Sequence, residues 1–183
     1  MKRTASPITA KYLQNAAVFY LERYASSAEG LRRVLRRRVS KARMLEAPVM
    51  DNVDEAIEAV VQKFVAAGLL DDKAFAQTKA RALHRRGVSG RLTRQRLQVA
   101  GVGRDDVDTA LAALDDELGT DPAKREVQAA LAFARRRRLG PFRLKDRDTN
   151  KARDLASMAR AGFAFALARR VIEATDPDTL DEA

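Results

Sequence analysis

Closely spaced arginines are the residues of this sequence whose type and spacing can do chemistry. A guanidinium group is planar, stays charged and binds a phosphate or carboxylate through two parallel hydrogen bonds. Since residues three and four apart lie on one face of a helix, a cluster of arginines can present several guanidinium groups on the same side. Three such groups are the candidate binding residues: Arg32, Arg33, Arg36 and Arg37; Arg85, Arg86, Arg91 and Arg94; and Arg135, Arg136 and Arg137.

The overall charge agrees with an anionic partner. The net charge is +10 and the isoelectric point is about 10.4, a balance that favours a polyanion or a membrane surface. Arginine outnumbers lysine 26 to 9. This ratio suits bidentate phosphate binding, but an arginine- and alanine-rich coding bias gives the same ratio. The two explanations carry equal weight, so the positions of the charges are more informative than their number.

Basic and acidic stretches alternate along the chain with a regular period. Each of three basic stretches is followed by an acidic one, and the pairs are 23–43 with 44–72, 73–104 with 105–126, and 135–170 with 171–183. Pairing between oppositely charged helices inside each unit explains the attraction but not the basic excess in every first half. A row of basic faces suits an elongated polyanion, and we favour that interpretation.

No pattern in the sequence predicts an enzyme, a cofactor or a metal site. Cysteine is absent and His84 is the only histidine, so a zinc site is not expected. The loop glycines form neither of the common phosphate-binding signatures, and no acid–base pair or nucleophile stands out. Without cysteine, and without an apolar run long enough to cross a bilayer, the protein is expected to be cytoplasmic.

The stretch from Gly68 to Ala76 must position the elements on either side of it. Gly68 follows an apolar series of helical period and can end that helix in the left-handed conformation. Asp71 can cap the next helix, and Leu70 and Phe75 have the spacing of a hydrophobic staple. Helix capping therefore accounts for the paired acids Asp71 and Asp72 better than a metal site does.

Other helix starts follow from similar signals. Ser6 with Pro7 predicts the start of the first helix, and residues 26–29 have the pattern of a capping box that opens the second. Residues 40–51 are expected to form a linker, after which Asn52 caps a third helix.

The same apolar pattern recurs along the chain. Leu97, Gly101, Val102, Val107 and Leu111 parallel Met158, Gly162, Phe163, Leu167 and Val171, with one single-residue shift. No strand-like alternation competes. We therefore expect an all-α fold of three tandem three-helix repeats stacked into an elongated, curved molecule. The expected boundaries are an N-terminal tail 1–8, repeats 9–68, 69–119 and 120–175, and an acidic tail 176–183.

A helix-turn-helix reader of duplex DNA is the main structural rival. Leu97, Gly101 and Val107 have about its spacing, but the second helix would place three acids of residues 104–108 against the phosphates. The basic stretches also contain few aromatic residues, which disfavours recognition of single strands by stacking. Contact with a phosphate backbone, without reading of sequence, fits better.

Several of these motifs resemble the RecX family, the bacterial regulatory proteins that restrain the RecA recombinase. Residues 20–23 with 27–35 resemble the first repeat of that family, and 68–76 with 85–87 resemble its central signature. Residues 97–102 resemble the end of the second helix in the same repeat, and 160–163 resemble the turn of the third. The likeness covers about residues 9–174, and the central motif is quite specific.

The resemblance implies a regulatory role in DNA repair, homologous recombination and the SOS response. It implies a monomer that binds RecA and RecA–DNA filaments, binds single- and double-stranded DNA without sequence preference, and modulates, most often by inhibition, recombinase and ATPase activity. The three arginine groups would then contact filament-bound DNA and acidic RecA surface. A stand-alone nonspecific DNA-binding protein is the alternative, and a basic protein of the membrane surface is a third, less favoured class.

Overall fold

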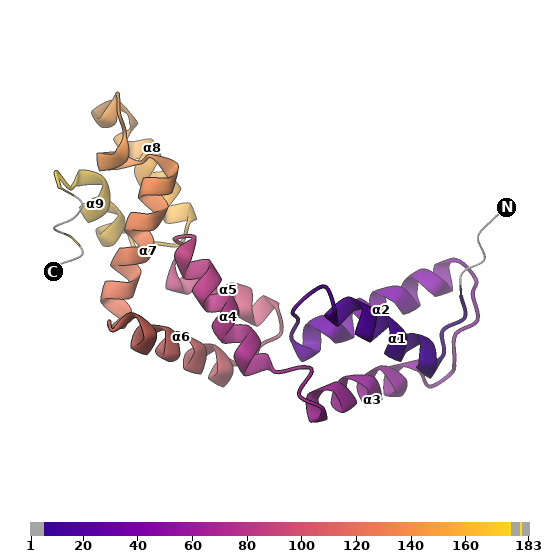
Figure 1. Ribbon diagram of the computed structural model, residues 1–183. Helices are drawn as coiled ribbons and strands as arrows, with labels where there is room; N and C mark the ends of the chain where they lie inside the picture. The colour runs from indigo at the N-terminus through magenta and orange to yellow at the C-terminus, as the bar shows by residue number, and fades with distance from the viewer. Residues whose placement is uncertain (1–5, 177–179, 181–183) are drawn as a thin grey trace. The chain divides into compact units, whose positions relative to one another are not determined.

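The computed structural model describes residues 6–176 and residue 180, and this part of the chain is helical (Figure 1). It contains one isolated bridge, between Ile8 and Val49, and no longer strand. The described elements are α1 (Ala10–Leu21), α2 (Ala28–Met44), α3 (Val53–Ala66), α4 (Asp72–Arg85), α5 (Gly90–Val99), α6 (Arg104–Leu118), α7 (Pro122–Arg137), the 3-10 helix η1 (Gly140–Phe142), α8 (Arg147–Arg160) and α9 (Phe165–Glu173). The prediction of an all-α fold is confirmed.

The described chain divides into two compact units. The first contains the residues up to Phe75 together with Ala100–Val102, and the second contains Ala76–Val99 and the residues from Gly103 onward. The helices follow one another in three sets of three, as tandem three-helix repeats require. The division into units falls inside α4, so the exact repeat boundaries stay a prediction.

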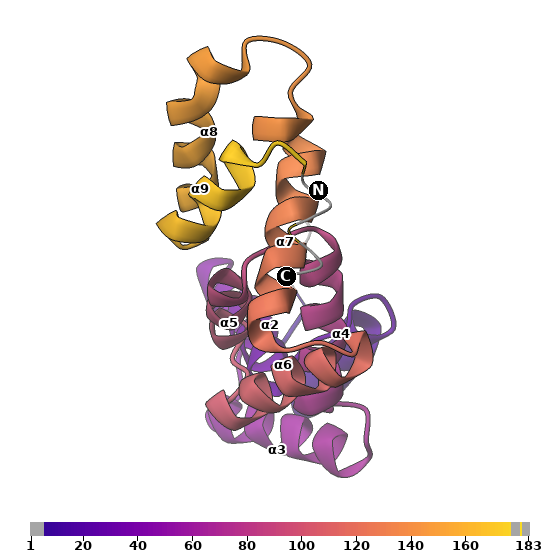
Figure 2. The same ribbon diagram turned by 90° about the vertical axis from the view of Figure 1, so that its left-hand side faces the viewer.

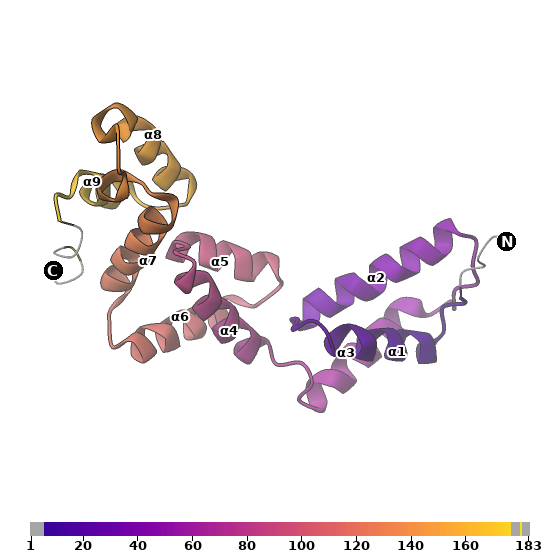
Figure 3. The same cartoon turned by 45° about the horizontal axis from the view of Figure 1, so that its top comes forward.

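The core of the first unit lies between α1, α2 and α3, which pack together (Figure 3). Leu13 of α1, Leu31 and Leu35 of α2, and Ile57 and Val61 of α3 are almost fully removed from solvent. Leu31 and Leu35 are four residues apart, as are Ile57 and Val61, so each pair lies on one apolar face of its helix. Burial of these faces leaves the arginines of α2 on the side that the core does not occupy.

The second unit has its main core between α7, α8 and α9. Figure 2 shows α8 and α9 beside α7. Ala130 and Phe133 of α7, Met158 of α8, and Val171 and Ile172 of α9 form this core. The apolar faces of α4, α5 and α6 are also buried, at Ala76, Ala80, Leu83, Leu97, Val107, Ala110, Leu111 and Leu114.

The helix end at Gly68 and the cap at Asp71 are as predicted, whereas the hydrophobic staple between Leu70 and Phe75 stays a prediction. Gly68 has φ +69°, and the N–H groups of Gly68 and Leu69 donate to the carbonyls of Val65 and Phe64, as in a Schellman motif. Asp71 caps α4, since its carboxylate accepts from the Ala74 N–H at 2.8 Å. Leu70 is buried.

Three predicted boundaries are wrong. Thr9, not Ser6, caps the first helix, because Ile8 is buried and its backbone is held between Pro48 and Met50. Ser27, not Ser26, caps α2. α2 also continues to Met44, so that only the end of the stretch 40–51 is a linker.

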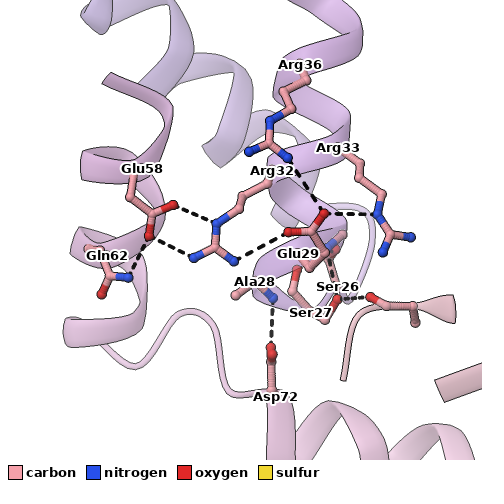
Figure 4. Close-up of polar contacts among 12 residues, drawn as sticks. Ser26, Ser27, Ala28, Glu29, Arg32, Arg33, Arg36, Glu58, Gln62 and Asp72 are labelled. Atoms are coloured by element: carbon pink, nitrogen blue, oxygen red, sulfur yellow. Dashed lines mark hydrogen bonds and ion pairs between the residues drawn. The ribbon is translucent and has the colours of Figure 1, made fainter. Parts of the chain in front are cut away.

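Hydrogen bonds also join helix ends that are far apart in the sequence. In the first unit, the Ser27 hydroxyl donates to the Ala100 carbonyl, and the Ala28 N–H donates to the Asp72 carboxylate at 2.7 Å (Figure 4). In the second unit the same arrangement recurs. The Ser89 hydroxyl donates to the Ala161 carbonyl at 2.9 Å, and the Gly90 N–H donates to the Glu126 carboxylate at 2.8 Å. We call each of these arrangements a serine joint.

A glycine in the left-handed conformation makes each serine joint possible. Gly101 has φ +90°, and a Cβ there would lie 2.3 Å from the Cβ of Glu29. Gly162 has φ +89°, and a Cβ there would lie 2.5 Å from the Ser89 Oγ. Glycine is therefore favoured at both positions for two reasons, the positive φ and the close approach of Glu29 or Ser89.

Candidate nucleic-acid interface

The first arginine group lies on α2, where the buried stripe of Leu31, Leu35 and Val39 fixes the outward face. Arg36 and Arg37 are exposed on that face. Glu29 accepts ion pairs from Arg33 at 3.2 Å, Arg32 at 3.7 Å and Arg36 at 3.8 Å (Figure 4). One carboxylate thus serves three guanidinium groups, and the surface keeps a local excess of positive charge.

Arg32 differs from the rest of its group because it is turned toward α3. Its Nε and terminal nitrogen donate to the two oxygens of Glu58 at 2.7 and 2.8 Å (Figure 4). Hydrogen bonds from Arg32, and then from Gln62, lower the pKa of Glu58 to about 2. Arg32 therefore follows the alternative in which basic and acidic helices pair inside a unit.

A cavity of about 550 Å³ lies beside the exposed arginines of α2. It is lined by Tyr20, Gly30, Arg33, Val34, Arg36, Arg37 and Ser40, with no carboxylate among them. Three of the four arginines predicted in this group thus line one concave surface of the first unit.

The second group is split between α4 and α5. Arg85 and Arg86 are exposed where α4 ends, and no ion pair is recorded for them in the described part of the chain. On α5, Arg94 forms an ion pair with Asp108 of α6. The Arg91 side chain donates to the Gly162 carbonyl at 3.5 Å. Arg85 and Arg86 are accordingly better placed for an external anion than Arg94 is.

The third group lies at the end of α7, where Arg138 takes the left-handed conformation that ends the helix. All three guanidinium groups lie near aromatic rings. Arg135 is 5.3 Å from the centre of the Phe142 ring, and Arg136 and Arg137 are 5.8 and 5.9 Å from that of Phe133. Such contacts hold a guanidinium group in place without neutralising its charge.

The structure groups two of these arginines with Arg96 and Arg160, which were not among the predicted binding residues. Arg96, Arg136, Arg137, Ser157 and Arg160 line a cavity of about 300 Å³ in the second unit, together with Gly87, Val88, Leu92, Phe133 and Ala161. Arg137, Ser157 and Arg160 also line an adjoining cavity of about 420 Å³, with Leu139, Arg143, Arg153 and Asp154. Arg96 and Arg160 are far apart in the sequence, so no local spacing predicted that they line one cavity.

Among the residues that the structure describes, Asp154 is the single carboxylate that lines these two cavities, and both of its oxygens already accept hydrogen bonds. Arg143 donates to both oxygens at 2.8 Å, and the Gly140 N–H donates to one of them at 2.9 Å. Burial raises the pKa of this carboxyl, but these hydrogen bonds outweigh it and hold the pKa below its ordinary value. The carboxylate is thereby fixed in the wall and leaves the other arginines of the cavities unneutralised.

No cluster of metal-ligating side chains occurs among residues 6–176 and 180. His84 is half-buried in the second unit. Burial lowers the pKa of its imidazole, and the nearby Arg125 guanidinium lowers it further against the opposing effect of Asp115. In the same described ranges, no helix is both long and apolar enough to cross a membrane.

The chain is similar to known proteins along most of its length. Residues 71–111 match the family model for the second three-helix domain of RecX. Regulatory protein RecX of Myxococcus xanthus is 40% identical over 168 residues, which cover 91% of this chain and 87% of that protein. Regulatory protein RecX of Agrobacterium fabrum is 36% identical over 113 residues, which cover 61% of this chain and 56% of that protein.

Two crystal structures share the fold. The structure of RecX from Lactobacillus salivarius superposes with a TM-score of 0.62 at 17% identity, covering 95% of this chain and 97% of that one. A second structure of a regulatory protein RecX gives a TM-score of 0.59 at 18% identity, covering 90% of this chain and 71% of that one. At these identities the likeness extends to the arrangement of helices.

Proposed function

The chain belongs to the RecX family of regulatory proteins, and from that premise we propose that it binds RecA and RecA–DNA filaments and inhibits recombinase and ATPase activity. One observation carries the proposal. Each compact unit has a concave surface lined by arginines, with Arg33, Arg36 and Arg37 in the first unit and Arg96, Arg136, Arg137 and Arg160 in the second. Phosphates of filament-bound DNA, or acidic groups on RecA, are the ligands that such surfaces suit.

The mechanism we propose is contact through charge rather than through sequence. Guanidinium groups that outnumber the carboxylates beside them can displace the counterions of the DNA backbone, and this release drives binding to any sequence. Occupation of the DNA and RecA surfaces that strand exchange requires would then restrain the recombinase. Binding of this kind needs no catalytic residue, so the protein acts as a regulator and not as an enzyme.

Two matched triple variants test which arginines do this. In Arg37→Gln, Arg85→Gln and Arg86→Gln, three exposed guanidinium groups without a recorded ion pair are removed. In Arg32→Gln, Arg81→Gln and Arg94→Gln, the same charge is lost from arginines that pair with Glu58, Glu117 and Asp108. Exposed ion pairs are worth only about 0–1 kcal/mol each, so both variants should fold.

Cosedimentation with RecA filaments, with naked DNA as the reference, and a RecA ATPase assay give the outcome. The first variant should bind filaments more weakly. A plot of the logarithm of its binding constant against the logarithm of salt concentration should have a slope smaller in magnitude by about 0.7–0.9 for each lost phosphate contact. The second should remain close to the wild type. Equal inhibition by the wild type and the first variant would show that these arginines are not the binding surface. Binding to naked DNA with no effect on RecA would favour the stand-alone DNA-binding alternative.

A further inference from the structure

The cavity of about 300 Å³ in the second unit has the composition of a binding site for a small, highly charged anion. Four arginines line it from three helices, with Arg96 on α5, Arg136 and Arg137 on α7, and Arg160 on α8. Ser157 adds a hydroxyl group, and no carboxylate of the described residues lines this cavity. We call these five residues the arginine pocket.

Apolar side chains make up the rest of the wall. Val88, Leu92 and Phe133 lie beside the guanidinium groups. A Cβ at Gly87 would be 2.4 Å from the backbone nitrogen of Phe133, so the turn after α4 rests directly against α7 at the edge of the pocket. Charges interact more strongly where apolar groups replace water. A partly apolar wall therefore strengthens the attraction of the pocket for an anion.

We propose that the arginine pocket binds a phosphate monoester, the group found at the 5′ end of a nucleic-acid strand and on a free nucleotide. A monoester carries nearly two negative charges near neutral pH and offers three acceptor oxygens, more than an internal phosphodiester does. Four guanidinium groups without a carboxylate favour the ligand of higher charge. The apolar wall suits the sugar and base attached to it.

The shape of the site separates this inference from the backbone contacts proposed above. A strand end or a nucleotide can enter a concave site that a continuous duplex only passes over. The inference assigns a ligand to the second-unit surface named in the proposed function and to that extent rests on it. Its test uses neither RecA nor a long DNA, so a failed monoester site and a failed regulatory function are seen in separate measurements.

The test compares short oligonucleotides that differ only at the 5′ end. Binding of a fluorescent single strand of a few nucleotides, labelled at its 3′ end and carrying a 5′-phosphate or a 5′-hydroxyl, is measured by anisotropy without RecA. The wild type should bind the phosphorylated strand at least tenfold more tightly, and pyrophosphate should compete. Equal affinity for the two strands would overturn the proposal.

Substitutions inside and outside the arginine pocket test which residues cause the preference for the 5′-phosphate. Arg137→Gln with Arg160→Gln should abolish the preference for the 5′-phosphate, and Arg96→Gln should reduce it. Lys79→Gln with Arg104→Gln removes the same charge from exposed positions of the second unit outside the pocket and should keep the preference. Circular dichroism melting checks that each variant is folded. A preference that survives in folded Arg137→Gln with Arg160→Gln would contradict the assignment.

A competition experiment distinguishes a free nucleotide from a strand end as the ligand that carries the monoester. If a nucleoside 5′-monophosphate competes at the same concentration as the phosphorylated strand, the ligand is a free nucleotide. If the strand competes at a much lower concentration, the ligand is a strand end. Either result supports a monoester site, whereas competition by neither would contradict it.

Discussion

Arg32 and Arg37 lie on the same helix but have different surroundings. They are five positions apart, so their side chains point about 140° away from each other around α2. Arg32 meets Glu58 of α3, and Arg37 is exposed beside a cavity. Helical periodicity alone predicts that the two differ. It does not predict which of them meets an acid, because that depends on how α2 and α3 pack.

Long-range contacts explain why part of the candidate site was not predictable. Arg136 and Arg137 belonged to a predicted arginine group, but Arg96 and Arg160 did not. These arginines are far apart in the sequence and line one cavity only after α5, α7 and α8 have packed. The alternation of basic and acidic stretches predicted ion pairs and exposed arginines equally well, and the structure contains both.

His84 provides a prediction about pH at the level of a single residue. Burial and the Arg125 guanidinium lower its pKa, so its NMR titration midpoint should fall below 6.5, the ordinary value. The unfolded chain then binds more protons than the folded one between the two pKa values. The free energy of unfolding should therefore fall as the pH drops below about 6.5.

The measurement is direct because the sequence contains a single histidine. Denaturant unfolding of the wild type between pH 5 and pH 7, beside His84→Gln, isolates the contribution of the imidazole, and the variant should show a flatter pH dependence in that interval. A midpoint at or above 6.5 would contradict the environment described for this residue.

At the level of elements, local capping signals were predictable and contacts between distant helix ends were not. Gly68 and Asp71 act as their sequence neighbours indicate. Ser26 and Ser27 are equally good caps by local criteria, but only Ser27 also reaches the Ala100 carbonyl, 73 residues away. Glu29, which would complete a capping box with Ser26, is instead surrounded by arginines.

The glycines of the serine joints allow a controlled test at this scale. Gly68, Gly101 and Gly162 all have positive φ, but a Cβ at Gly68 would meet no atom within 4 Å. Gly68→Ala should therefore cost only the backbone strain of an alanine in the left-handed region, about 1–2 kcal/mol. Gly101→Ala and Gly162→Ala should cost clearly more, because the new methyl group also collides with Glu29 or Ser89.

Urea unfolding of the three variants under identical conditions measures the difference. If all three lose the same free energy of unfolding, the close approach at the serine joints contributes nothing beyond backbone strain. A larger loss at both joint glycines than at Gly68 would show that the close approach contributes to stability at both joints.

At the level of the whole molecule, the sequence predicted the number and order of the helices better than their grouping. The parallel between residues 97–111 and 158–171 predicted tandem repeats, and the described part of the chain has three successive sets of three α-helices. The segment Ala100–Val102 nevertheless belongs to the first compact unit, although the helices on either side belong to the second. The boundaries of the sequence repeats and of the compact units therefore differ, because the end of a helix can pack against helices of the neighbouring repeat.

Hydrogen exchange at two backbone amides reports on the opening of the serine joints. Ala28 and Gly90 are the first residues of α2 and α5, and such N–H groups have no partner inside their own helix. They normally exchange with deuterium almost as fast as in an unfolded chain. Here each is bonded to a carboxylate, of Asp72 or of Glu126. Their exchange rates therefore measure how often each serine joint opens.

Hydrogen exchange followed by NMR should find both amides slower than the amide of Arg104. That residue also begins a helix, but its capping residue, Gly103, supplies no side-chain acceptor. Asp72→Ala should accelerate exchange at Ala28 and leave Gly90 unchanged. Three equal rates would mean that the joints are open for most of the time. Any slowing of either amide on addition of RecA filaments or DNA would record, residue by residue, which joint the partner holds shut.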